Sequence, residues 1–329
     1  MEDQKCYIFK AITNKWNEKY LKNEKYIKFR KKNKHKMKTK KSPYPFVKWA
    51  GGKRQLISQM KKFFPNNFNN YIEPFVGGGA VFFHLFKNNR IKNKVILIDI
   101  NKDLINCYKV IKNDVESLIE ELMIHEKDKM NKKYYYKIRS LDRDPIEYNK
   151  LSNVEKAARI IYMNRVCFNG LYRVNSKGQF NVPFGRYKNP TVCDQENLRV
   201  VSKALKNVVL VHGSYEECLN YIEKNDFIYL DPPYHPKSGS SSFTSYTKED
   251  FQKQSQIELH KLFQKLSKKK CFLMLSNSYT DFIKDLYKDY ILKTLKAKRA
   301  INSDAEKRGK IKEILILNYD MHKSHKKCI

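Results

Sequence analysis

The segment FIYLDPPYHP, residues 227–236, places a carboxylate, two prolines and an aromatic ring directly after an apolar run. Asp231 offers a hydrogen-bond acceptor, while Pro232 and Pro233 fix their own φ angles and carry no N–H to compete for nearby carbonyls. A carboxylate and a main-chain carbonyl together can accept both hydrogens of an amino group. Tyr234 adds a flat face on which a base can stack. We interpret these four residues as a site for a planar, amino-bearing ring; a ligand-free proline turn is the alternative.

A glycine run in EPFVGGGA, residues 73–80, lies between an expected strand and an expected helix. Glycines allow the backbone to approach a ligand closely, and the N-terminus of a helix adds positive potential. Asp99 ends the next apolar run about 20 residues beyond Gly79, where an acid can accept hydrogen bonds from a ribose. The combination favours an adenosine-bearing cofactor, either a dinucleotide or S-adenosylmethionine, and the absence of GxGxxG weakens the dinucleotide case. A flexible turn and a helix-capping Asp are the alternatives.

Alternating strand and helix patterns supply the elements that must position these residues. Apolar runs typical of buried strands predict an α/β fold with a doubly wound, mostly parallel sheet. Helical patterns dominate from about 103 to about 195, and this stretch is interpreted as an insertion into the sheet domain. Strands are expected in YIEPF, KVILIDI (94–100), NVVLVHGSY (207–215), FIYLDPPY (227–234), CFLMLSNS (271–278) and KEILILNYD (312–320), and helices over 101–127, capped by Asn101 or Asp103, and near 249–267.

The chain carries 67 Lys and Arg against 34 Asp and Glu, a formal net charge of +33 over 329 residues. Such a charge favours a polyanionic partner, since phosphates attract it at long range and release counterions on binding. Part of the charge belongs to residues 1–41, which end in RKKNKHKMKTKK and are expected to form a disordered arm. The arm could add affinity for DNA, carry a targeting signal or be inert, and codon usage that favours Lys is a further explanation of the charge.

Seven cysteines are scattered without a CxxC pair, and eight histidines form no HxxxH pattern. The unpaired cysteines suit a reducing compartment, so we expect most of them to be small buried side chains and expect no metal. No apolar run approaches the length of a membrane span, and no secretion leader opens the chain. We therefore expect a soluble cytoplasmic protein, or a nuclear or organellar one in a eukaryotic host.

Five blocks occur in order along residues 43–320: FVKWAGGKRQL, EPFVGGGA, LIDIN, NRVCFNGLYRVNSKGQFNVPFGRYKNP and DPPY. In this order the chain resembles the DNA adenine methyltransferases of the Dam/DpnM type, which have the alpha arrangement of motifs and methylate adenine in GATC. The resemblance implies a Rossmann-like, S-adenosylmethionine-dependent methyltransferase sheet, mostly parallel with the last strand antiparallel. It also implies a basic arm at 1–41, a catalytic domain at 42–102 plus 196–322, an inserted, mainly helical target-recognition domain with a β-hairpin at 103–195, and a tail at 323–329.

The same resemblance implies a set of cofactor contacts. Trp49 and Lys53, in KWAGGK, match residues that contact S-adenosylmethionine, and Asp99 matches the acid that binds its ribose. On chemistry alone, Trp49 could be part of the core, and Lys53 could be a solvated charge or a phosphate contact. Asp231 matches the residue that touches both the cofactor and the target amine, and Tyr234 matches the stacking aromatic. The loop on the methionine side is implied to comprise Phe75, Gly77, Gly78 and Gly79.

Matched positions in the insertion are implied to contact DNA. Leu171, Arg173 and Pro183 match base-contacting positions, and an Arg fork can read guanine in the major groove. Phe168 and Asn169 match the pair that enters the duplex near the vacated base, where a ring can fill the gap. The alternatives are core packing for the apolar side chains and a surface salt bridge or phosphate contact for the arginines. Further DNA contacts are implied for Lys48, Arg186 and Tyr187, and the serine-rich segment 238–247 is implied to close over the adenine, with a flexible linker as its alternative.

Together these features predict a monomeric, site-specific adenine methyltransferase that acts on double-stranded DNA. The acceptors around Asp231 would hold the amino group of an adenine extruded from the helix, in line with the methyl of S-adenosylmethionine. An RNA adenine methyltransferase and a non-catalytic DNA-binding protein on the same scaffold are the alternatives, with an NAD-dependent oxidoreductase a distant third. The sequence leaves the biological role open between restriction–modification, a phage function and a solitary one.

Overall fold

A computed structural model describes residues 42–236, 251, 253–298 and 310–320 of the chain. The predicted arm at 1–41, the serine-rich segment at 238–247 and the tail at 323–329 lie outside the described residues. Strands and helices alternate along the described part, as the sequence predicts.

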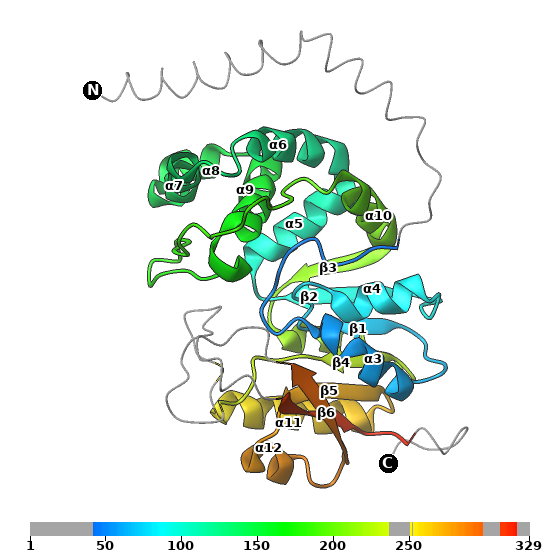
Figure 1. The fold of residues 1–329 in the computed structure, drawn as a ribbon. Coiled ribbons are helices and arrows are strands. Elements are labelled where there is room, and N and C mark those ends of the chain that lie inside the picture. Colours follow the sequence, from blue (N-terminus) through cyan, green and yellow to red (C-terminus); the bar gives the residue numbers. More distant parts are fainter. Residues whose placement is uncertain (1–41, 237–250, 252, 299–309, 321–329) are drawn as a thin grey trace. The chain divides into compact units, whose positions relative to one another are not determined.

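Seven strands form one sheet: β1 (Tyr71–Glu73), β2 (Val95–Asp99), β3 (Val208–His212), β4 (Phe227–Leu230), β5 (Phe272–Ser278), β6 (Ile291–Lys298) and β7 (Lys310–Leu317). Their order across the sheet is β3-β2-β1-β4-β5-β7-β6 (Figure 1). Neighbouring strands from β3 to β5 are parallel, whereas β7 is antiparallel to both β5 and β6. The prediction of a mostly parallel sheet with an antiparallel last strand is confirmed.

Alternate side chains of the strands enter two separate cores. Tyr71 and Phe227 belong to one core, whereas their chain neighbours Ile72 and Ile228 belong to the other. Successive side chains of a strand point to opposite faces, so both faces of the sheet are covered. Each central strand is therefore apolar along its whole length, which explains why such runs predict the strands.

Helices cover both faces of the sheet. The core that contains Tyr71 includes side chains of α4, α5, α6, α9 and α10, and the core that contains Ile72 includes side chains of α11 and α12. The helices are α3 (Ile57–Met60), α4 (Ala80–Lys87), α5 (Lys102–Asn113), α6 (Val115–Lys127), α7 (Lys132–Ser140), α8 (Pro145–Lys150), α9 (Asn153–Val166), α10 (Gln195–Leu205), α11 (Lys253–Lys268) and α12 (Asp281–Leu286), with short 3-10 turns η1 (Lys53–Gln55), η2 (Lys61–Phe63), η3 (Leu141–Arg143), η4 (Phe168–Gly170) and η5 (Tyr215–Asn220).

The helical stretch predicted over 101–127 consists of two helices. Asn101 is the N-cap of α5, and its Oδ1 accepts a hydrogen bond from the N–H of Leu104 at 2.9 Å. The alternative cap, Asp103, lies inside the first turn. Asp114 has a φ of −148°, which separates α5 from α6. The helix α5 contacts β3 as well as α9, so the helices that follow β2 pack directly against the sheet (Figure 1).

The predicted β-hairpin follows α9. Two isolated antiparallel bridges, Cys167 with Phe184 and Val174 with Phe180, join its arms. The tip turns within residues 175–179, where the N–H of residue 175 donates to the carbonyl of residue 179 at 2.9 Å. The hairpin is thus held at separate points instead of by a regular ladder.

Strand β6 is absent from the sequence prediction. Its sequence ILKTLKAK mixes apolar residues with lysines, as an edge strand does, and lacks the continuous apolar run of the central strands. The side chain of Gln59 forms two hydrogen bonds with the main chain of Lys296, at 2.9 and 3.0 Å. This contact ties the edge strand to α3, a link between distant segments that no local pattern indicates.

Four of the five cysteines within the described residues are buried, as expected of small core side chains. In the same part of the chain, no helix is long and apolar enough to cross a membrane. Among these residues, no group of three or more His, Cys, Asp and Glu side chains could hold a metal ion.

Candidate active site

The parallel strands bring their carboxyl ends to one edge of the sheet. Glu73 ends β1, Asp99 ends β2 and Asp231 follows β4. The strands β1 and β4 are neighbours, but the chain leaves β1 toward β2 and leaves β4 toward β5, on opposite sides. Ligands of open α/β sheets bind at such a reversal of strand order. Both sequence-predicted carboxylates lie at this edge, and Asp231 lies at the reversal itself.

A buried ion pair joins Asp231 to Lys53. The ammonium Nζ of Lys53 lies 2.8 Å from Oδ1 of Asp231, and the Lys53 side chain is only 4% exposed. The same ammonium donates a hydrogen bond to the carbonyl of Gly51 and lies 4.7 Å from the ring centroid of Tyr234. Lys53 is therefore not a solvated charge, which is one of the alternatives that the sequence leaves open. It brings the KWAGGK and DPPY segments into direct contact.

The protonation of Asp231 follows from opposing effects. The pKa of Asp231 is raised to about 6 in all: burial raises it most, the Lys53 ammonium lowers it, and the Glu313 carboxylate raises it. A carboxyl group with this pKa is mostly ionised at pH 7. In that form both of its oxygens are hydrogen-bond acceptors.

The ring of Tyr234 is held from the antiparallel strand β7. Its hydroxyl donates a hydrogen bond to Oε2 of Glu313 at 2.6 Å. Burial raises the pKa of Tyr234 well above its ordinary value, so the ring stays a neutral phenol. Glu313 could not be found from the sequence, because KEILILNYD indicates only an apolar strand and gives no sign that one acid in it faces the DPPY segment.

A pair of buried amides holds the main chain of the DPPY segment. Gln256 of α11 donates to the carbonyl of Pro233 at 2.9 Å and accepts from Nδ2 of Asn277 at 2.9 Å. Oδ1 of Asn277 in turn accepts from the N–H of His235 at 3.1 Å. Within the described residues, no donor binds the carbonyl of Pro232. The carbonyl of Pro232 is thus an acceptor available to a ligand, directly after the Asp231 carboxylate in the chain.

The glycine run is shaped by Asp99. Its Oδ2 accepts from the N–H of Gly77 at 2.9 Å, and its Oδ1 accepts from the N–H of Asn101 at 2.8 Å. Gly77 has a φ of +48°, and a Cβ there would lie 2.9 Å from Cδ1 of Trp49, so only glycine fits. A Cβ at Gly78 would make only ordinary contacts. Burial raises the pKa of Asp99 to about 6, against the two main-chain hydrogen bonds, which lower it.

An aromatic cluster includes Phe75, which follows β1, and Tyr215, which follows β3. It therefore belongs to the same edge of the sheet as Asp99 and Asp231. The ring of Phe75 stacks on that of Tyr215 with centroids 5.2 Å apart, and Phe251 meets both rings edge-on. Ile100, directly after Asp99, is 57% exposed. Of this group, only Phe75 is predicted from the sequence to lie at the site. The aromatic that follows HGS at the end of β3 is the signal that could have pointed to Tyr215, because it occupies the same edge as the two carboxylates.

The residues predicted to enter DNA lie at the start of the hairpin. Phe168 is 46% exposed, which excludes simple core packing, and Asn169 has a left-handed φ of 56°. Gly170 packs on Lys48, since a Cβ at this glycine would lie 2.5 Å from Cδ of Lys48. The Lys48 ammonium lies 3.9 Å from the ring centroid of Tyr187, so these two predicted DNA contacts are neighbours.

The remaining predicted DNA contacts differ in exposure. Arg173, Pro183 and Arg186 are exposed, whereas Leu171 is partly buried and packs against the core. Nε of Arg173 donates to Oδ1 of Asn181 at 2.7 Å. No carboxylate of the described residues forms an ion pair with either arginine. The surface salt bridge is therefore not seen in this part of the chain.

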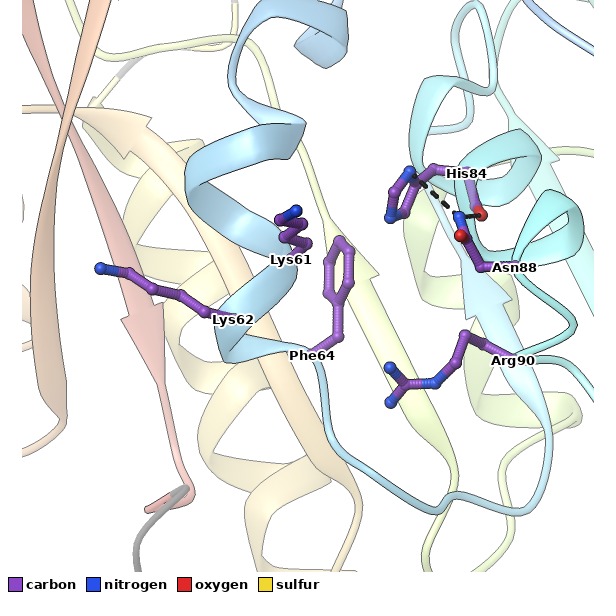
Figure 2. A pocket seen from close by; sticks show the side chains of 6 residues that line it. All are labelled: Lys61, Lys62, Phe64, His84, Asn88 and Arg90. Atoms are coloured by element: carbon purple, nitrogen blue, oxygen red, sulfur yellow. Dashed lines mark hydrogen bonds between the residues drawn. The ribbon is translucent and has the colours of Figure 1, made fainter.

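A separate, mainly basic hollow lies between η2 and the last turn of α4 (Figure 2). Because α4 begins after the glycine run and is about 12 Å long, its last turn is remote from Asp231. Burial, followed by neighbouring cations, lowers the pKa of His84, so its ring is neutral at pH 7. The hollow shares no residue with the predicted site. Its lining consists of Lys61, Lys62, Phe64, His84, Asn88 and Arg90.

Comparison with known proteins places this site in a family. The model of the D12 class N6 adenine-specific DNA methyltransferases matches residues 49–301. The chain is 49% identical to the type II methyltransferase M.MjaIII of Methanocaldococcus jannaschii over 84% of this chain and 99% of that protein. It is 45% identical to the type II methyltransferase M1.LlaDCHI of Lactococcus lactis subsp. cremoris, over 86% and 98% of the two chains.

A third relative is the DNA adenine methylase of Haemophilus influenzae, which is 36% identical over 85% of this chain and 96% of that protein. The resemblance to DNA adenine methyltransferases that the five sequence blocks indicate is thus confirmed. The matched region contains the glycine run, the hairpin and the DPPY segment. The chain belongs to the D12 class of N6 adenine-specific DNA methyltransferases.

Proposed function

We propose that this protein transfers a methyl group from S-adenosylmethionine to the exocyclic amino group of an adenine swung out of double-stranded DNA, with GATC as its site. One observation carries the proposal. Asp231 and Tyr234 are held together at the reversal of strand order, with the carbonyl of Pro232 free among the described residues. This set offers two acceptors and a ring to a planar amine.

The residues at the sheet edge fit S-adenosylmethionine. Asp99 presents a carboxylate for the ribose hydroxyls, and the rings of Phe75 and Tyr215 offer flat faces to an adenine. Gly77 leaves no room for a side chain and keeps the loop close to Trp49. The Lys53 ammonium matches the carboxylate of the methionine part in charge. When bound, S-adenosylmethionine supplies an electrophilic methyl group.

The residues around Asp231 would activate the amine by position and hydrogen bonding. The amino group of adenine is a weak nucleophile because its lone pair is conjugated with the ring. Asp231 and the carbonyl of Pro232 accept its two hydrogens, which localises the lone pair and aims it. Extruding the base costs roughly a few kcal/mol. Stacking on Tyr234 returns roughly 1–3 kcal/mol of this, by analogy with other base–aromatic contacts.

The hairpin would read the sequence and hold the opened duplex. Asn181 fixes one edge of the Arg173 guanidinium, which leaves its other N–H groups for the acceptors of a guanine. Phe168, exposed at the start of the hairpin, would fill the gap left by the extruded base. Lys48 and Tyr187, in contact with each other, would bind close by.

The direct test uses S-adenosylmethionine labelled on its methyl group and a set of short duplexes. One duplex contains GATC, and each of the others differs from it at one base pair. We expect label in the adenine of the GATC duplex and much less in every other one. Equal labelling of all duplexes would overturn the GATC assignment, and labelling of RNA but not of DNA would overturn the assignment of the substrate.

A further inference from the structure

The Lys53 ammonium engages the groups that the proposed function assigns to the target amine. It lies 2.8 Å from Oδ1 of Asp231 and 4.7 Å from the ring centroid of Tyr234. A base that stacks on a ring lies about 3.5 Å from it, so an ammonium at this distance occupies the space of a stacked base or borders it directly. In chemical terms, Lys53 offers N–H donors to a carboxylate beside an aromatic ring, as an amino-bearing purine would.

The position is built, since each contact of the ammonium is to a buried or partly buried group. The side chain of Lys53 is 4% exposed and that of Asp231 is 18% exposed. The carbonyl of Gly51 accepts a further hydrogen bond from the Lys53 ammonium. Gly51 has a left-handed φ of +74° in the turn that makes this contact. An unpaired carboxylate at this depth would be costly, and the ammonium compensates its charge.

The two partners that the proposed function brings to the site differ in what they offer Lys53. The adenine amine is neutral and competes for the same acceptors. The α-carboxylate of S-adenosylmethionine is an anion, and a lysine ammonium on four flexible carbon–carbon bonds can exchange one carboxylate for another. The sulfonium of the same molecule would also be repelled by an ammonium that stayed on Asp231.

We propose that Lys53 holds the place of the target amine in the cofactor-free enzyme and turns to the carboxylate of the bound cofactor, so that capture of the base depends on the cofactor. This inference rests on the proposed function and adds an order to it. Lys53 is a positioning residue in this account. It protects Asp231 while the site is empty and releases it when both substrates are present.

The test measures base extrusion in the absence of methyl transfer. A duplex with 2-aminopurine next to the target adenine gains fluorescence when the adenine leaves the stack, because the probe then loses its stacking neighbour. The duplex is titrated with wild type and with Lys53→Met, each alone, with S-adenosylhomocysteine, and with 5′-methylthioadenosine, which lacks the amino acid part. Lys62→Met serves as the control, because Lys62 is exposed and removal of its ammonium changes the net charge equally.

For wild type and Lys62→Met, we expect strong fluorescence only with S-adenosylhomocysteine. For Lys53→Met, we expect the same fluorescence without any ligand, at a dissociation constant about tenfold lower than that of ligand-free wild type, because the competent state is no longer blocked. Lys53→Met should also bind S-adenosylhomocysteine more weakly than wild type does, while its affinity for 5′-methylthioadenosine is unchanged. The unchanged affinity shows that the variant is folded.

Equal dependence on S-adenosylhomocysteine in wild type and Lys53→Met would overturn the inference, as would strong fluorescence of ligand-free wild type. Failure of the proposed function has a different signature. In that case wild type would neither label the adenine duplex nor raise the 2-aminopurine fluorescence under any condition. A wild type that labels adenine but shows no difference from Lys53→Met in the fluorescence titration refutes only the role of Lys53.

Discussion

Two regions of the molecule are built in opposite ways: the carboxyl edge of the sheet, where we propose catalysis, and the hairpin, where we propose DNA recognition. At the edge, Asp231 is paired with Lys53, and the hydroxyl of Tyr234 is bound by Glu313. In the hairpin, isolated bridges replace a ladder, and Phe168 is 46% exposed. Arg173 is anchored on one edge only. The side chains of Asp231 and Tyr234 are thus held in place by charged partners within the protein, while the side chains of the hairpin keep free hydrogen-bonding capacity and exposed apolar surface.

The difference fits the role that we propose for each region. Electrostatic activation works only if the acceptors are fixed before the reaction, because reorganisation during the reaction would lower the gain. Reading a duplex instead requires side chains that have free hydrogen-bond donors and that can change conformation to fit the groove. Mutations at the edge should therefore lower the rate at full binding, and mutations in the hairpin should change which DNA is chosen.

The largest effect is expected for Asp231→Ala. Removal of the carboxylate takes away the acceptor of the amine, so single-turnover methyl transfer should fall by about 10³-fold. DNA affinity, measured by anisotropy, should stay within a factor of a few, because the hairpin is untouched. Asp285→Ala, an exposed acid on α12, is the control. Turnover close to that of wild type would refute the role of Asp231.

A smaller loss is expected for Gln256→Leu. This change leaves the carbonyl of Pro233 and Nδ2 of Asn277 without their partner, and a small displacement of the DPPY main chain can lower the rate about 10²-fold. The unpaired groups should also reduce the free energy of unfolding by about 1–3 kcal/mol. Gln254→Leu, two residues earlier and exposed, should change neither quantity. An unaltered rate in destabilised Gln256→Leu would show that the amide pair serves stability alone.

Arg173→Ala should act on selectivity instead. Loss of a bidentate contact to guanine should lower discrimination against a wrong base pair by about 1–3 kcal/mol. The discrimination is measured as the ratio of kcat/KM for the matched duplex to that for the altered duplex. Arg186→Ala, which we expect to remove a contact to the phosphates, should weaken all duplexes alike and reduce the salt dependence of binding. If Arg173→Ala also weakens every duplex equally, its guanidinium binds the backbone.

The pH dependence should show the buried carboxyl directly. Burial raises the pKa of Asp231 to about 6, so the group gains a proton as the pH falls through 6 and loses its full capacity as an acceptor. Methyl transfer should then fall about tenfold for each pH unit below 6. For stability the sign is opposite, since ionising a buried Asp with a raised pKa removes stability as the pH rises through 6. In Lys53→Met the limb should move to higher pH, because Lys53 lowers this pKa.

Much of the fold can be predicted from the sequence, because the central strands are covered on both faces and therefore apolar throughout. The ends of those strands then place Asp99 and Asp231 at one edge without further information. The partners of these groups cannot be predicted in this way. Distant segments supply Lys53, Gln256 and Glu313 to the site. No local sequence pattern indicates that these side chains contact it.

Some side-chain contacts at the site are not implied by the resemblance to the family. The resemblance assigns Lys53 to the cofactor, and only the structure shows that this ammonium is paired with Asp231. Likewise, the stacked ring of Tyr215 follows a strand end that gives no sign of its aromatic partner Phe75. Contacts of this kind depend on the relative placement of strands, which a one-dimensional pattern does not contain.

The central claim is that Asp231 grips the amino group of the extruded base. It is tested most directly by comparing two duplexes, one with adenine at the target position and one with purine, which lacks the amino group. Binding of both is measured with S-adenosylhomocysteine present, for wild type and for Asp231→Ala. We predict that loss of the amino group weakens binding to wild type by about 10- to 100-fold and leaves binding to Asp231→Ala unchanged. Equal weakening in both proteins would contradict the account.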